Sequence, residues 1–284
     1  MARRPRLPQR RLVTLTSDVG SAYAAQMKAA LIAGGVPPGQ IIDLAHDLPP
    51  HGVREAAFLL REMARSFPST SVHVVVVDPG VGGRRNAIVV TTRTGPLLVG
   101  PDNGVLLPLA DELGIRIVHR IDPRKLPKRK RVGTTFDGRD LFAPVAARLA
   151  TGTRPQDLGL PIVPAPFSLP PPLRTARGAR GEVLHVDRFG NLITNIPSAW
   201  VPDGTARLGV RVGSIGRPAV PWVTSYEALG AESLGTLASS FGLVEVAVRE
   251  ARASDRLDAG VGTPVVLSWR RPPTARGANA NSAA

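Results

Sequence analysis

Acidic residues stand at the ends of three predicted strands in the first half of the chain. Asp18, Asp78 and Asp102 each follow a segment that reads as a strand, and each begins a loop that contains glycine. In an open α/β sheet, ligands collect at the carboxyl ends of the strands. A carboxylate there can accept hydrogen bonds from ribose hydroxyls or take a proton from water. Taken singly, Asp18 as a helix cap and Asp102 as part of a β-turn are the plainer interpretations.

The loop 78–85, with the sequence Asp-Pro-Gly-Val-Gly-Gly-Arg-Arg, carries a stronger indication of function. Asp78 follows the β-branched segment 72–77, which is typical of a strand buried on both faces. A carboxylate in such a place is costly without a role, and the glycines let the backbone approach a ligand closely. Arg85 brings a positive charge into the same loop. We therefore favour a functional loop over a turn with a surface arginine pair.

A fourth polar loop, Thr-Phe-Asp-Gly-Arg-Asp at 135–140, leads into a predicted helix. Asp140 reads as the N-cap of that helix. The cap does not account for Asp137 and Arg139, so these two residues need another explanation. We keep Asp137 as a candidate for chemistry.

The densest polar cluster of the second half is the segment 186–195. Asp187 and Asn191 can recognise the polar edges of a ligand, and Phe189 can stack on a purine. The alternative is a β-hairpin that turns at Gly190 and Asn191. Ser240, in the segment Ser-Ser-Phe-Gly at 239–242, is a lesser candidate of the same kind.

The elements that position these loops alternate between strand and helix in the first half of the chain. Apolar runs predict strands, and apolar residues at helical spacing predict helices. This alternation predicts an α/β domain with a largely parallel sheet. The expected strands are 12–17, 41–44, 72–77, 87–92, 97–100 and 115–119, and the expected helices are 23–34, 53–67, 104–113 and 140–150.

The second half has a different pattern. The segment 153–180 is rich in proline, which predicts a linker without regular structure. Beyond it the apolar period becomes two, which predicts a small C-terminal antiparallel β-barrel domain. The expected strands there are 182–186, 191–196, 207–212, 235–238, 244–248 and 265–269. The predicted organisation is a basic disordered arm (1–11), an α/β domain (12–152), the linker (153–180), the β-barrel domain (181–270) and a disordered tail (271–284).

Composition excludes several classes of protein. With 284 residues and 43% hydrophobic residues, the chain can bury a core and is not a disordered protein. The absence of cysteine excludes disulfides, thiolate metal sites and cysteine nucleophiles. The longest apolar run, 72–77, is too short to cross a membrane, and no apolar signal segment follows the first arginines. We therefore expect a cytoplasmic protein that does not bind membranes.

The net charge of +14 raises the question of nucleic-acid binding. The segments 1–11, 120–131 and 174–180 together carry all of this excess, so the rest of the chain is nearly neutral. Nucleic-acid-binding surfaces usually interleave aromatic residues with basic ones, and none lies inside these segments. We expect no specific nucleic-acid partner. The five histidines do not form a metal-ligand pattern either.

Five segments in the same order resemble one family, the S-adenosyl-L-methionine (SAM) hydroxide adenosyltransferases, which are related to fluorinase and chlorinase. The similarity runs from about Leu12 to Leu267. It rests on the segments TSDVG (16–20), VHVVVVDPGVG (72–82), GPDNGVL (100–106), TTFDGRDLFAPVAARLATG (134–152) and VDRFGNLITNI (186–196).

The resemblance implies an α/β domain joined to a β-barrel, assembled as a homotrimer. SAM would lie between the N-terminal domain of one subunit and the C-terminal domain of its neighbour. Water or hydroxide would attack C5′ of the ribose, which releases L-methionine and leaves adenosine. SAM is then the substrate, and no cofactor is implied.

The resemblance also assigns substrate contacts. Asp18 would bind the ribose hydroxyls. His51 falls where the halogenating relatives line the substrate pocket, so it could contact SAM. The residues around the adenine and the methionine group would be Asp187, Phe189, Asn191 and Ser240.

The catalytic set departs from the family at one position. The hydrolytic members carry Asp, Arg and His beside the attacking water, and these fall on Asp78, Arg85 and Asp137. The family pattern Phe-His-Gly-Arg-Asp here reads Phe-Asp-Gly-Arg-Asp. A carboxylate cannot supply the neutral donor and acceptor of imidazole. We expect slow hydrolysis; the alternative is a catalytically impaired SAM- or adenosine-binding protein.

Overall fold

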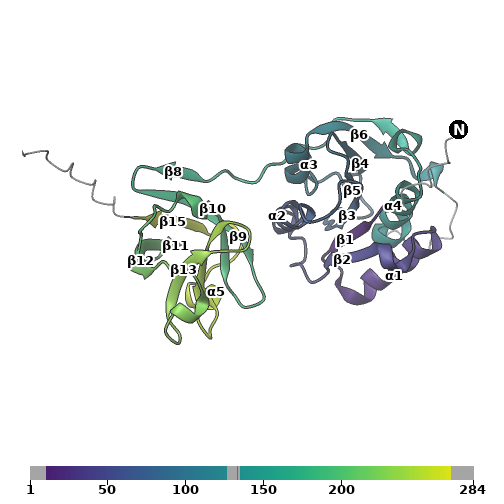
Figure 1. Ribbon diagram of the computed structural model, residues 1–284. Coiled ribbons are helices and arrows are strands. Elements are labelled where there is room, and N and C mark those ends of the chain that lie inside the picture. Colours follow the sequence, from purple (N-terminus) through teal and green to yellow (C-terminus); the bar gives the residue numbers. More distant parts are fainter. Residues whose placement is uncertain (1–10, 127–132, 134, 270–284) are drawn as a thin grey trace, which may run out of the picture. The chain divides into compact units, whose positions relative to one another are not determined.

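The computed structural model describes residues 11–126, 133 and 135–269 (Figure 1). Most of the expected basic arm, the expected tail and half of the basic segment 120–131 lie outside these residues. The chain divides into two compact units, Met1–Leu169 and Pro170–Ala284. Among the described residues, no helix has the length and apolar character needed to cross a membrane.

A seven-stranded sheet in the order β2-β1-β3-β5-β4-β6-β7 forms the centre of the first unit. Strands β1, β2, β3, β5 and β6 run one way and β4 and β7 run the other, so the sheet is largely parallel. The predicted α/β class is confirmed. The strands are β1 Val13–Ser17, β2 Ile41–Ala45, β3 Val72–Val76, β4 Ala87–Thr92, β5 Leu97–Pro101, β6 Ile115–Ile121 and β7 Gly159–Pro161.

Helices cover both faces of this sheet (Figure 1). Helix α1 (Gly20–Ala33) and helix α4 (Ala143–Ala150) share a core cluster with β1 and β3. Helices α2 (Val53–Ala64) and α3 (Leu107–Leu113) lie on the other side. Burial on both faces explains why four of the five residues of β3 are valine, because side chains on each face of the strand enter a core.

The end of α1 lies so close to α4 that only glycine fits there. A Cβ atom added to Gly34 would lie 2.4 Å from the Cβ of Ala147. The same glycine ends the helix, which agrees with the predicted stop.

The expectation of a linker without regular structure is wrong in part. Between residues 153 and 180 the chain forms a 3₁₀ turn (Pro155–Asp157), β7, β8 (Leu173–Thr175) and the start of β9. Strand β7 is the edge strand of the first sheet, paired antiparallel with β6. An edge strand tolerates proline because one row of its backbone groups has no neighbouring strand, which is why Pro161 did not prevent pairing.

The second unit is an antiparallel, nearly closed barrel, as predicted. Its strand order is β12-β11-β15-β9-β10-β14-β13, with β8 paired to β9. An isolated bridge joins Trp222, which directly follows β12, to Thr236 in the middle of β13. The strands are β9 Gly178–Val186, β10 Leu192–Pro197, β11 Arg207–Val212, β12 Ile215–Pro221, β13 Leu234–Ala238, β14 Leu243–Val248 and β15 Pro264–Ser268, and a short helix α5 covers Ala253–Arg256.

Strand β12 was not expected from the sequence. Gly216 and Pro218 interrupt its period-two pattern, and both are unfavourable in strands. Pairing with β11 over the register Arg207↔Pro221 to Val212↔Ile215 nevertheless holds this segment extended.

Candidate active site

Three charged side chains from two distant loops meet at the carboxyl end of the first sheet. Arg85 Nε donates a hydrogen bond to Asp78 Oδ2 at 2.8 Å, and Arg85 Nη2 donates to the same oxygen. Arg85 Nη2 also donates to Asp137 Oδ2 at 2.6 Å. The sequence predicted these three residues as the catalytic set, and the structure brings all three together.

The surroundings hold this charged group rigidly. The guanidinium of Arg85 lies 5.4 Å from the centre of the Phe142 ring, in a cation–π contact. Asp137 begins the π-helical turn Gly138–Phe142 that leads into α4. A Cβ on Gly138 would lie 2.8 Å from the Phe136 ring and 3.1 Å from Met27 Sδ, so the loop requires glycine at this point.

Burial and charge together define what the group can do. The side chains of Asp78, Arg85 and Asp137 are 4%, 14% and 11% exposed. Burial disfavours the charged form of Arg85, but hydrogen bonds and charge from both carboxylates outweigh it and raise the pKa of Arg85. With both carboxylates ionised, the group carries one net negative charge. It can orient a water molecule and attract a cationic substrate.

Arg139, from the same loop, has a structural role. Its guanidinium donates to Asp140 Oδ1 at 2.7 Å and to Gln26 Oε1 of α1 at 2.9 Å, and it stacks 5.4 Å from the centre of the Phe136 ring. These contacts tie the loop to α1. They explain the presence of Arg139, which the predicted helix cap did not account for.

The loop after β1 places Asp18 beside His51. Asp18 Oδ2 accepts a hydrogen bond from the backbone N–H of His51 at 2.9 Å. His51 has φ of 66°, a left-handed conformation that is uncommon for a residue other than glycine. The structure thus brings together two residues that the sequence predicted separately for substrate binding.

Hydrogen bonds of His46 form a second network, which supports the loop after β1. His46 Nδ1 lies 2.7 Å from Ser17 Oγ, His46 Nε2 lies 2.9 Å from Asp43 Oδ1, and Gly20 N donates to His46 O at 2.9 Å. Burial acts to raise the pKa of Asp43, but hydrogen bonds from Lys28 and His46 outweigh it and lower that pKa. Sequence reasoning gave His46 no role, because nothing local to it shows that it reaches Ser17.

The side chains of Asp102 and Asn103 form hydrogen bonds with backbone groups. Asp102 Oδ1 accepts from Ala165 N at 2.8 Å, and Asn103 Nδ2 donates to Val77 O at 2.9 Å. The plainer interpretation of this turn therefore holds.

In the second unit, Asp187 organises the turn between β9 and β10. Its Oδ1 accepts from Phe189 N at 2.9 Å and from Asn191 N at 2.8 Å, and its Oδ2 accepts from Asn191 Nδ2 at 3.0 Å. Both the hairpin and the functional interpretation fit these contacts. Phe189 is 74% exposed, which is unusual for an aromatic side chain held in an ordered turn.

A cavity of about 610 Å³ opens beside this turn. That volume suits a ligand of small-molecule size. Asp187, Phe189 and Asn191 line it together with Tyr226 and the segment 248–252.

Two successive domains of one family match this chain. The SAM hydroxide adenosyltransferase N-terminal domain matches residues 13–159, and the C-terminal domain of that name matches residues 181–266. The chain belongs to the SAM hydroxide adenosyltransferase family. The resemblance stated from the sequence is therefore confirmed.

Individual members of the family are similar to this chain over most of its length. It is 40% identical over 268 residues to the (R)-S-adenosyl-L-methionine hydrolase of Thermus thermophilus, covering 90% of this chain and 99% of the relative. It is 40% identical over 252 residues to the (R)-S-adenosyl-L-methionine hydrolase of Salinispora arenicola, covering 86% and 93%. A fluorinase of an Actinoplanes species is more distant, at 24% identity over 216 residues, or 65% of this chain and 71% of the relative.

Solved structures share the fold. An uncharacterized conserved protein from Thermotoga maritima superposes with a TM-score of 0.82 at 33% identity, covering 90% of this chain and 99% of that one. A conserved hypothetical protein from Thermus thermophilus superposes with a TM-score of 0.70 at 35% identity, with the same coverage.

The structure separates Ser240 from the other predicted residues of the second unit. Ser240 lies in the turn before β14, whereas the cavity lies beyond the other end of that strand, at Val248. The register Leu192↔Val246 and Pro197↔Leu243 places the Asp187 turn and the Ser240 turn at opposite ends of β10 and β14. Ser240 is exposed and does not line the cavity around Asp187.

Sequence reasoning missed two polar residues beside that cavity. Tyr226 Oη donates a hydrogen bond to Glu245 Oε1 at 2.5 Å, and Glu245 is 4% exposed. Burial raises the pKa of Glu245, and the nearby charge of Asp187 adds to the effect. Glu245 stands in a run of β-branched residues in β14, and a buried carboxylate in such a run was the signal that could have found it.

Proposed function

We propose that this protein hydrolyses SAM to adenosine and L-methionine. The observation that carries the proposal is the buried group of Asp78, Arg85 and Asp137 at the carboxyl end of the first sheet. Its single negative charge suits a sulfonium substrate, which is a cation. Relatives named as (R)-S-adenosyl-L-methionine hydrolases, 40% identical to this chain, support the same reaction.

The reaction is a displacement at the saturated C5′ carbon of the ribose. The oxygen of water forms a bond to C5′ while the C5′–S bond breaks, and that electron pair stays on sulfur as the neutral thioether of methionine. The sulfonium is already an activated leaving group, so no general acid is required. The enzyme must place water in line with the C5′–S bond and accept its proton.

The charged group supplies these two functions. Asp78 accepts a hydrogen bond from the attacking water and takes its proton, directly or through a second water. Arg85 holds Asp78 and Asp137 apart in fixed orientations and stabilises hydroxide character at the nucleophile. Asp137 stands where hydrolytic members carry histidine and acts as a second acceptor.

The substrate contacts divide between the two units. In the first unit, Asp18 binds the ribose hydroxyls and His51 lies beside it. In the second unit, the cavity beside Asp187 receives the adenine and part of the methionine group, with Phe189 stacking on the purine and Asn191 on its polar edge. Ser240 does not line this cavity, so its contact with the substrate stays a prediction from the family resemblance.

We further propose a cytoplasmic homotrimer in which SAM lies between the first unit of one subunit and the second unit of its neighbour. The exposed ring of Phe189 supports this arrangement, because an exposed aromatic side chain beside a cavity is typical of an incomplete ligand site. SAM is the substrate, and the reaction needs no cofactor. We keep the predicted two-domain organisation but place the boundary between Leu169 and Pro170, because β7 pairs in the first sheet and β8 pairs with β9.

A second candidate is a SAM- or adenosine-binding protein that turns over little substrate. The observation that favours it is the engagement of Arg85 by two carboxylates, which offsets the positive field that would favour hydroxide.

Chromatography of a SAM incubation separates the two candidates. Adenosine and methionine should form in equal amounts, with and without chloride. Chlorinated nucleoside should be absent, because one net negative charge at the site repels halide. Asp78→Asn should abolish turnover while Asp111→Asn, an exposed carboxylate of α3, should not. Binding of SAM without any product would contradict hydrolysis and favour the binding protein.

A further inference from the structure

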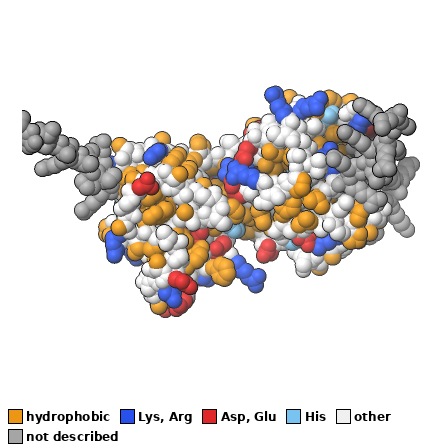
Figure 2. Space-filling model, in the orientation of Figure 1, with side chains coloured by type: hydrophobic (Ala, Val, Ile, Leu, Met, Phe, Trp, Pro, Cys, Tyr) orange, Lys and Arg blue, Asp and Glu red, His pale blue; other side chains and the backbone are white. Residues whose placement is uncertain are grey.

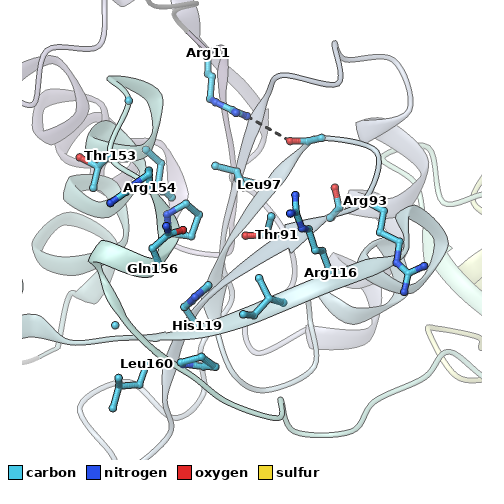
Figure 3. A pocket seen from close by; sticks show the side chains of 18 residues that line it. Arg11, Thr91, Arg93, Leu97, Arg116, His119, Thr153, Arg154, Gln156 and Leu160 are labelled. Carbon is cyan, nitrogen blue, oxygen red and sulfur yellow. Dashed lines mark hydrogen bonds between the residues drawn. The ribbon is translucent and has the colours of Figure 1, made fainter.

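Figure 3 shows a second cavity, in the first unit. Its volume is about 940 Å³. It is lined by Arg11, which precedes β1, by Leu97 at the start of β5, and by the end of β4. These positions are at the amino ends of the parallel strands, whereas Asp18 and Asp78 follow their carboxyl ends. The cavity is therefore separate from the proposed reaction.

The charge of this cavity is positive. Arg11, Arg93, Arg116 and Arg154 line it, and no acidic residue is among the described residues that line it. Arg154 is paired with Asp157 at 3.1 Å. Within the part of the chain that the structure describes, the other three arginines have no carboxylate within ion-pair distance. Arg11 donates to the backbone oxygens of Thr70 and Gly95, at 3.2 and 3.4 Å.

Two residues that line the cavity carry buried side-chain atoms with no hydrogen-bond partner among the described residues. His119 is 3% exposed, and its Nδ1 has no hydrogen-bond partner among the described residues. Thr91 Oγ1 is also buried and has no hydrogen-bond partner among the described residues. The pairings Val89↔His119 and Thr91↔Ile117 place both side chains on one face of the sheet. Buried polar groups are nearly always hydrogen-bonded, so two unpaired ones in one cavity point to a missing ligand or ordered water.

Apolar side chains complete the lining. Leu160 is 67% exposed and Ile117 is 37% exposed, on strands β7 and β6. Free anions do not need such a surface, but a ligand with a flat apolar part does. The volume is also far larger than one phosphate requires and lies in the range of small-molecule sites.

We propose that this cavity binds a phosphorylated small molecule of nucleotide size. Arg116 contacts its phosphate groups, because a guanidinium group pairs with phosphate oxygens in two parallel hydrogen bonds. Thr91 Oγ1 and His119 Nδ1 hydrogen-bond to polar atoms of the ligand on the floor of the cavity. Ile117 and Leu160 cover its apolar part.

Calorimetry on the full chain tests this proposal with two probes. Inorganic tripolyphosphate has no nucleoside and cannot use an adenosine site, and ATP adds the nucleoside. We expect both to bind, ATP more tightly, with affinity that falls as salt rises. Arg116→Gln should weaken both by about tenfold or more, the loss expected for a charged hydrogen bond. Arg217→Gln, which removes an exposed arginine of β12, should leave both within about twofold.

Any of three results would overturn the proposal. Neither probe binds at millimolar concentration, Arg116→Gln and Arg217→Gln weaken binding equally, or ATP binds no more tightly than tripolyphosphate. None of these results depends on SAM hydrolysis, so failure here leaves the proposed function untouched.

Thr91→Val supplies an independent check on the cavity floor. It replaces the unpaired hydroxyl by a methyl group of the same shape, so the free protein should be as stable as the parent or more so. The rise in melting temperature that ATP produces should nevertheless shrink. An unchanged ATP effect would contradict the assignment of Thr91 to the ligand.

Discussion

The candidate site residues of the two units are built in opposite ways. In the first unit, Asp78 and Asp137 lie 59 residues apart and are held by one arginine in a buried ion-pair network. In the second unit, Asp187 holds its own turn through backbone hydrogen bonds within four residues, and Phe189 points into solvent. Buried charges with fixed orientation suit chemistry, whereas a self-contained turn with an exposed ring suits recognition.

This comparison predicts that removing Arg85 has the largest effect. Arg85→Ala leaves two carboxylates facing each other in a buried place, so we expect about 3–5 kcal/mol of destabilisation. SAM hydrolysis should fall by about 10³-fold or more. Arg84→Ala removes the exposed neighbouring arginine and should change neither quantity appreciably. Denaturant unfolding measures the stability of each variant, and product chromatography measures its rate of SAM hydrolysis. Parallel losses in the two variants would show that the ion-pair network has no special role.

Acid should destabilise the first unit through His73, on β3. Burial lowers the pKa of His73 to about 4, from 6.5 in the unfolded chain. Between pH 6.5 and pH 4, His73 is therefore protonated in the unfolded state but not in the folded state. The free energy of unfolding consequently falls between about pH 6.5 and pH 4. The loss is about 3 kcal/mol at most.

Unfolding curves at pH 7 and pH 4 check this prediction. His73→Gln should flatten that part of the pH dependence, whereas His51→Gln, at an exposed position, should not. The same pH dependence in the parent and in His73→Gln would assign the effect to other groups.

Asp187→Ala should act on recognition and not on the chemical step. It removes the acceptor of three hydrogen bonds in the turn, so KM for SAM should rise by about 10–100-fold, with a smaller change in kcat. Asp187→Asn keeps a carbonyl oxygen at the same place and should recover part of the affinity. A fall in kcat as large as that of Arg85→Ala would remove the distinction between the two units.

Asp137→His should produce the smallest change. It introduces the histidine that the family resemblance implies at this position and removes one negative charge beside Arg85. We expect hydrolysis to quicken by about tenfold, within the range of a positioned proton acceptor. Steady-state rates of SAM hydrolysis by the two proteins measure this effect. A slower or unchanged Asp137→His variant would mean that the carboxylate is suited to this site.

Surface charge shows why composition alone was a poor guide. The net charge of +14 suggested a basic protein, but Lys and Arg side chains form separate groups on the face that Figure 2 shows, not one continuous band. Two arginines that are not fully exposed have specific partners. Arg85 pairs with carboxylates, and Arg11 donates to backbone oxygens.

Much of this protein was readable from its sequence. The period of the apolar residues predicted nearly all the strands and helices of both units, because burial of one face or of both determines that period directly. The loops that carry Asp18, Asp78, Asp137 and Asp187 stand out for the same reason, since polar residues interrupt buried segments there. The order of five such segments was enough to indicate the family.

Only the tertiary structure decided which of these residues meet. It joins Asp137 to Arg85 across 52 residues, sets His51 against Asp18, and brings His46 to Ser17. It also separates Ser240 from Asp187, pairs Tyr226 with Glu245, and adds β7 and β12 to the sheets. Local sequence records how each segment is buried. Contacts between distant segments depend on strand order, register and the packing of helices, and no local pattern records these.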